Sequence, residues 1–135
     1  MIKLLAIGAY AAVAFTTISA PTARAEEPEA AAKNKVTIPA TTEGILAEIQ
    51  KRHDELDAAV KDKKLADVHH HAFAIRDLAR ALPAKAPADK QARVQGAVNN
   101  LGKLAQDLDA SGDAGDQAKT ESNLKKFDAV LVQLE

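Results

Sequence analysis

The chain of 135 residues contains no cysteine and no tryptophan, and its one methionine is the first residue. Without cysteine no disulfide can constrain the unfolded chain, so the stability of the folded protein must come from packing alone. The sulfur ligands of iron–sulfur clusters, of Cu(I) sites and of covalently attached haem are also missing. We therefore expect neither haem nor catalysis by a thiolate.

Aromatic residues make up 3% of the sequence, and after residue 25 only Phe73 and Phe127 remain. The chain therefore lacks the stacking surfaces on which nucleotide bases bind. Its formal net charge is −1, whereas nucleic-acid binding requires a dense basic surface. These absences predict a protein that binds neither nucleotides nor nucleic acid.

The first 25 residues have the three parts of a secretion signal. Lys3 gives the positive start, and an apolar run of 12 residues follows from Leu4 to Phe15. Ala23 and Ala25 are small residues of the kind that flank a cleavage site. Because a membrane-spanning helix needs roughly 20 apolar residues, we expect a signal peptide over residues 1–25 that is cleaved after Ala25, with no stable membrane insertion. The predicted location is the periplasm.

Residues 26–40 are charged, rich in alanine and interrupted by Pro28 and Pro39, which is typical of a flexible lead-in. In residues 41–135 apolar positions recur at helical spacing, and no segment alternates like a strand. This pattern forms four stripes, one for each predicted helix. They consist of Ile45, Ile49, Leu56 and Val60; Leu65, Val68, Ala72, Ile75, Ala79 and Leu82; Val94, Ala97, Val98, Leu101, Leu104, Ala105 and Leu108; and Leu124, Phe127, Leu131 and Leu134.

Capping and helix-breaking residues mark the ends of these helices. They are Thr41 or Thr42 before the first helix, which runs to about Lys61; Pro83 after the second; Gly112 as a left-handed cap after the third; and Asp113 or Asp116 before the fourth. Helices joined by short loops must fold back on their neighbours. The sequence therefore predicts an all-α fold, an antiparallel up-down-up-down four-helix bundle over residues 41–135.

Three of the four histidines are neighbours in the second predicted helix, at positions 69 to 71. Successive residues of a helix are rotated by about 100°, so the three rings fan out and cannot all bind one ion. Relative to the apolar stripe, His71 lies at the edge that faces the core, His69 lies at the opposite margin, and His70 points to solvent. Only His71 has a clear direction towards the interior.

The fourth histidine, His53, lies on the buried side of the first predicted helix. Because the following turn is centred near Lys63, we expect His53 to lie less than one helical turn from His71. Bundles build metal sites from side chains on facing helices, and Asp67 can either bind the ion or orient the His71 ring. The predicted ligands of a Cu2+, Zn2+, Ni2+ or Co2+ ion are His53 and His71, with Asp67 and His69 as further candidates.

Other interpretations of these polar residues stay open. The histidines can be satisfied by neighbouring polar groups without any metal, or can sense pH, because imidazole titrates near neutrality. The run DLDASGDAGD, residues 107–116, fits the opening of a calcium loop, but the twelfth position is Ala118 instead of a bidentate glutamate. A helix end explains that run better. No arrangement of nucleophile, base and acid can be assembled, so we expect no enzyme activity.

Two longer segments, VHHHAFAIRDLARALP and LDASGDAGDQAKTESN, carry a resemblance to a known group of proteins. The chain from about Thr41 to its end resembles small exported bacterial helical proteins with similar HAFAIRDL and SGDAGD segments. Such proteins often look to be encoded beside heavy-metal efflux systems. The resemblance implies a periplasmic helical bundle connected with metal resistance.

The function that we predict from the sequence is binding of a divalent transition metal by a periplasmic buffer or carrier protein in metal tolerance. We expect a monomer or a weak dimer. The alternative is a metal-free adaptor whose second helix docks an envelope partner, such as an efflux component. These two functions differ in whether a chelator changes what the protein binds.

Overall fold

The computed structural model describes residues 36–135, so the predicted signal peptide and residues 26–35 of the lead-in lie outside the described residues. Within residues 36–135 the secondary structure is helical and contains no strand, which confirms the predicted all-α fold for this part of the chain. The α-helices are α2 (Thr42–Lys61), α3 (Val68–Ala79), α4 (Gln91–Asp113) and α5 (Gln117–Leu131). The 3-10 helices are η1 (Leu65–Asp67), η2 (Pro83–Lys85) and η3 (Val132–Leu134).

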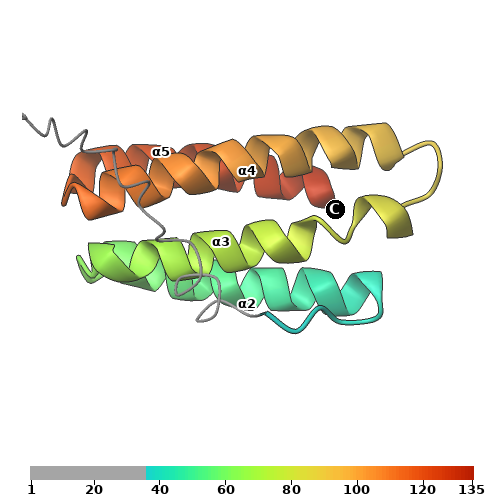
Figure 1. The fold of residues 1–135 in the computed structure, drawn as a ribbon, viewed down its shortest axis with the longest axis horizontal. Helices are drawn as coiled ribbons and strands as arrows, with labels where there is room; N and C mark the ends of the chain where they lie inside the picture. Colours follow the sequence, from blue (N-terminus) through green and yellow to red (C-terminus); the bar gives the residue numbers. More distant parts are fainter. Residues whose placement is uncertain (1–35) are drawn as a thin grey trace, which may run out of the picture.

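The four α-helices lie side by side, with α2 and α3 forming one pair and α4 and α5 the other (Figure 1). Helix α3 also packs against α4 and joins the two pairs, whereas α2 and α5 contact each other sparsely. No helix in residues 36–135 has both the length and the apolar character needed to cross a membrane. The contact between α3 and α4 is the one that positions the candidate site described below.

The core is made mostly of the predicted apolar stripes, but Leu65, Leu104 and Leu131 are only partly buried, and Leu78 is buried although it lies outside the predicted stripes. Phe127 is fully buried and is the largest side chain in the interior. The alanines at positions 72, 79, 97 and 105 are also buried, so the helices can approach closely at these points although each alanine buries little apolar area. The large apolar side chains that are fully buried are Ile45, Leu56, Val60, Val68, Ile75, Leu78, Leu101, Leu108 and Phe127.

Two of the predicted caps are confirmed by their hydrogen bonds. Thr41 Oγ1 accepts a hydrogen bond of 3.1 Å from the backbone N–H of Gly44 at the start of α2. Asp116 Oδ1 accepts one of 3.0 Å from the backbone N–H of Lys119 at the start of α5. Each oxygen satisfies a donor that the first turn of a helix leaves without an intrahelical partner. Thr42 lies inside α2 and does not cap it.

The prediction that Gly112 is a left-handed cap is wrong. Helix α4 continues to Asp113, and the glycine with a positive φ is Gly115, at 67°. Gly112 is buried in the last turn of α4, where an added Cβ would lie 2.7 Å from the backbone oxygen of Leu65. The lack of a side chain at Gly112 therefore allows close packing between α4 and η1.

The second predicted helix, from Leu65 to Leu82, is α-helical only from Val68 to Ala79. The three residues before it form the 3-10 helix η1. After Ala79 the backbone N–H of Leu82 donates to the carbonyl of Ala79, only three residues back, at 3.0 Å. Pro83 has no N–H and cannot continue the helix, so the chain leaves it in a tightened turn. Leu82 is nevertheless buried, as its stripe predicts.

Candidate metal centre

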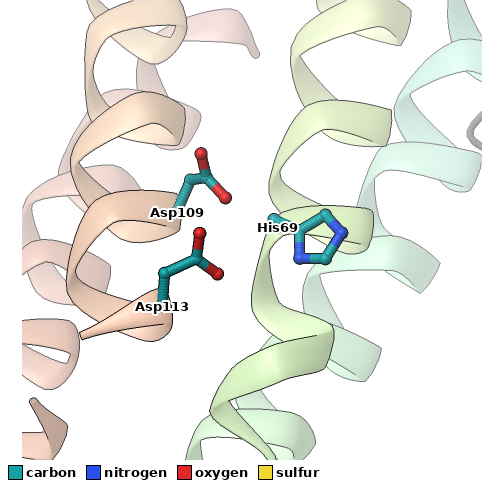
Figure 2. A group of neighbouring side chains, drawn as sticks. All are labelled: His69, Asp109 and Asp113. Carbon is teal, nitrogen blue, oxygen red and sulfur yellow. The ribbon is translucent and has the colours of Figure 1, made fainter. Parts of the chain in front are cut away.

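Three side chains from two helices meet at one end of the α3–α4 contact. Asp109 and Asp113 are four residues apart on α4, so they lie one above the other on the same face of the helix. Figure 2 shows both carboxylates pointing from α4 towards α3, where His69 is the second residue. One ligand atom from each of the three residues lies within 4.8 Å of the other two. No other group of three His, Cys, Asp or Glu residues in positions 36–135 comes as close.

The imidazole of His69 has a buried nitrogen without a hydrogen-bond partner. Its Nδ1 atom is shielded from solvent, and no protein group donates to it or accepts from it. A buried polar atom without a partner costs free energy, on the order of 1–3 kcal/mol. The ring is also held in place by the neighbouring ring of His70, whose centroid lies 3.8 Å away. A cation bound to this nitrogen would supply the missing partner.

The electrostatic environment of Asp109 shows how closely the group is packed. Partial burial of the Asp109 carboxyl raises its pKa above the ordinary value. The neighbouring charge of Asp113 raises this pKa further, and His69 lowers it. Burial and a like charge both disfavour the ionised carboxylate. A cation placed between the two carboxylates would offset both of these costs.

His53, a predicted ligand, is paired elsewhere. Its Nε2 atom lies 2.8 Å from Oδ1 of Asp128 on α5, so the hydrogen bond joins α2 to α5. The side chain of His53 is 23% exposed and that of Asp128 44%, and both line a cleft of about 330 Å³ between the two helices. His53 therefore faces α5, whereas the prediction placed it opposite His71 on α3.

His71, the other principal predicted ligand, has an acidic neighbour on α2. Its Nδ1 atom lies 3.2 Å from Oε2 of Glu55, although the ring geometry does not make a hydrogen bond of this contact. Glu55 in turn accepts a hydrogen bond of 3.2 Å from Arg52. The structure thus gives His53 and His71 separate acidic neighbours, from α5 and α2 respectively.

The remaining predicted residues have different surroundings. Asp67 is exposed at the start of α3, and its side chain makes no capping hydrogen bond. His70, which is expected to point to solvent, is half-buried beside His69. Of the four predicted ligands, His69 is the one that the structure places in a three-residue group.

The sequence pattern does not reveal Asp109 and Asp113 as ligands, because the segment around them has the features of a helix end. Once α4 extends through Gly112 to Asp113, the two aspartates have the spacing of side chains that share a helix face. That spacing was visible in DLDASGD, but it has meaning only if the helix continues through Ser111 and Gly112. A glycine at the end of an apolar stripe is an ordinary helix stop, so the sequence signal favoured the wrong end.

Comparison of the chain with protein-family models, with curated proteins and with solved structures found no match.

Proposed function

We propose that this protein binds a divalent transition-metal ion through His69, Asp109 and Asp113. The observation that carries the proposal is the buried Nδ1 atom of His69, which has no hydrogen-bond partner although two carboxylates lie beside the ring. The Nδ1 atom of His71 is also buried without a hydrogen bond, but it has one carboxylate beside it, that of Glu55, whereas two carboxylates lie beside the His69 ring. A cation bound to Nδ1 would provide the partner that this atom lacks and would neutralise the two carboxylates.

The ligand types restrict the class of ion. Imidazole with carboxylates suits Zn2+, Co2+, Ni2+ and Cu2+, whereas Cu(I) prefers sulfur and Ca2+ prefers a shell of oxygens. In a tetrahedral site with bonds of about 2.0–2.2 Å the ligand atoms lie about 3.3–3.6 Å apart. The three ligand atoms lie within 4.8 Å of one another, so modest rotations of the aspartate side chains bring them to that distance.

The number of protein ligands favours reversible binding. Three protein ligands leave at least one coordination position to water, as in open zinc sites and unlike closed structural ones. Asp113 is exposed, so this position is accessible to solvent and to a competing ligand. An exchangeable ion is what a metal buffer or carrier requires, and this role fits the site better than that of a permanent structural ion.

The setting that we propose for this activity comes from the sequence. The signal-like residues 1–25 support export to the periplasm, and the short connections support an up-down-up-down order of the four helices. The two segments that resemble proteins encoded near heavy-metal efflux systems are VHHHAFAIRDLARALP and LDASGDAGDQAKTESN, and together they contain all three proposed ligands. We therefore place the metal binding in metal tolerance.

A calorimetric titration with Zn2+ at neutral pH tests the proposal. We expect about one site per chain in the wild type and loss of that site in His69→Ala and Asp109→Asn. Asp107→Asn is the matched control, because Asp107 is an exposed aspartate on the same helix outside the group. His53→Ala and His71→Ala should keep the site. Loss of binding in those two variants, with binding retained in His69→Ala, would instead support the two-histidine site that the sequence predicted.

A further inference from the structure

Gly112 differs from the other glycines of α4 in what surrounds it. A Cβ atom added at Gly112 would lie 2.7 Å from the backbone oxygen of Leu65 and 3.6 Å from Cβ of Val68. At Gly96 and Gly102 an added Cβ would have no atom within 4 Å. Real Cβ atoms essentially never approach another heavy atom to less than 3.0 Å, so of these three glycines only Gly112 lies where the packing requires a missing side chain.

This close contact lies inside the proposed metal site. On α4, Gly112 lies between Asp109 and Asp113 in the sequence. The residues that it contacts across the interface, Leu65 and Val68, come shortly before the ligand His69 in the chain. Any movement at the contact is therefore transmitted to the distance between the imidazole and the two carboxylates, because η1 and α3 are continuous in the chain.

The carbonyl of Leu65 is not free to turn away from an added side chain. It accepts a hydrogen bond from the backbone N–H of Val68 within the turn of η1. Rotation of the carbonyl would break that bond in a buried region, at a cost on the order of 1–3 kcal/mol. Separation of α3 from α4 is consequently the easier way to accommodate a methyl group at position 112.

The separation required is large compared with the tolerance of a metal site. Moving the Cβ contact from 2.7 Å to the 3.4 Å at which ordinary contacts begin opens the gap by about 0.7 Å. Metal–ligand distances in well-formed sites stay within about 0.2 Å of their preferred values. We infer that Gly112 is a positioning residue of the proposed site, which holds His69 close enough to Asp109 and Asp113 for ions with short bonds. The inference rests on the proposed metal binding.

The choice of ion follows from the same spacing. Zn2+ prefers bonds of about 2.0–2.2 Å to nitrogen and oxygen. Cd2+ is a larger ion that also accepts imidazole and carboxylate ligands, so it tolerates a wider group better. The close approach at Gly112 should therefore favour Zn2+ over Cd2+, and a wider α3–α4 gap should reduce that preference.

The test compares Gly112→Ala with Gly102→Ala in the full chain, with Zn2+ and Cd2+ titrated against a chromophoric chelator. Residues that orient ligands without binding the ion typically contribute about 10- to 100-fold to metal affinity. We expect Gly112→Ala to lower the affinity for Zn2+ by that factor. The affinity for Cd2+ should fall by a smaller factor. Gly102→Ala should leave both affinities unchanged, because its methyl group meets nothing within 4 Å.

A lengthened ligand separates positioning from a general loss of packing. In the Gly112→Ala background, Asp109→Glu extends the carboxylate by one methylene and should recover part of the Zn2+ affinity. In the wild-type background the same change should weaken it. If Gly112→Ala loses its helical circular-dichroism signal, Val68→Ile replaces it, since that variant adds one methyl group beside the same contact.

The outcomes distinguish this inference from the proposed function. If the wild type does not bind Zn2+, both are wrong. If the wild type binds and His69→Ala does not, the proposed function stands. Unchanged Zn2+ affinity in the folded Gly112→Ala protein, an equal loss in Gly102→Ala, or an equal loss of Zn2+ and Cd2+ would then overturn the inference alone.

Discussion

Replacement of Asp109 by asparagine should stabilise the metal-free protein while removing its metal binding. Burial and the neighbouring Asp113 raise the pKa of the Asp109 carboxyl, so its ionised form is less stable in the folded chain than in the unfolded one. At neutral pH this cost is present in full. It is relieved as the pH falls through the folded-state pKa, because the folded protein then binds a proton more tightly than the unfolded chain does. Asparagine is nearly isosteric with the protonated side chain and carries no charge.

The magnitude follows from the spacing of the two aspartates. Like charges four residues apart on a helix destabilise it by about 0.2–0.5 kcal/mol, and partial burial of Asp109 adds to this. We expect Asp109→Asn to raise the free energy of unfolding by about 0.5 kcal/mol at neutral pH, which corresponds to a Tm about 2–4 °C higher for a domain of this size. Near pH 4, around the ordinary pKa of aspartate, the difference from the wild type should shrink towards zero.

The assay is thermal unfolding followed by circular dichroism in the presence of a chelator, because the chain has no tryptophan to report unfolding by fluorescence. Addition of Zn2+ at 100 times its dissociation constant should stabilise the wild type by about 2.7 kcal/mol and leave Asp109→Asn unchanged, so the order of the two proteins reverses. Asp107→Asn, on the same helix, should change neither value by much. A less stable Asp109→Asn protein without metal would refute the reasoning, since it would mean that the carboxylate stabilises the fold.

Three further substitutions test the packing that supports the site. Phe127→Ala removes the largest fully buried side chain and should lower the free energy of unfolding, measured by urea denaturation, by about 3–5 kcal/mol. A decrease of less than about 1 kcal/mol would contradict the place of Phe127 in the core. Asn123→Ala removes the donor to two oxygens on α4, the part-buried carbonyl of Asp107 at 3.0 Å and the buried hydroxyl of Ser111 at 3.3 Å. The substitution should cost about 1–3 kcal/mol in the same assay, whereas an unchanged midpoint would show that water replaces the amide. Asp116→Ala removes the N-cap of α5 and should lower the free energy of unfolding by about 1 kcal/mol, which a lower Tm would show. Asp113→Ala is the control, because Asp113 does not cap α5.

The fold could be predicted because helical periodicity and capping chemistry are local signals. The stripes give the buried faces, and Thr41 and Asp116 give the starts of α2 and α5. The register between α2 and α3 was also accessible. Glu55 and His71 are each eight residues from Lys63, the turn residue with a φ of 58°, and they lie beside each other in the structure.

The candidate site could not be predicted in the same way, because it depends on rotation about helix axes and on contacts between distant segments. The position of the turn correctly predicts which part of α2 lies at the same height as His71. However, Glu55 is two residues after His53, and two residues correspond to a rotation of about 200° around the helix axis. Glu55 consequently faces His71, and His53 faces Asp128. The contact of Gly112 with Leu65 joins positions almost fifty residues apart, and nothing in the local sequence distinguishes it from a helix stop.

The measurement that tests the metal site most directly is crystallographic location of the ion by anomalous scattering at the zinc edge. Crystals of the full chain grown with one equivalent of Zn2+ should show a single anomalous peak bonded to an imidazole nitrogen of His69 and to oxygens of Asp109 and Asp113, at about 2.0–2.2 Å. A peak bonded to His53 or His71 instead, or no ordered zinc at a concentration that saturates binding in solution, would contradict the proposed site.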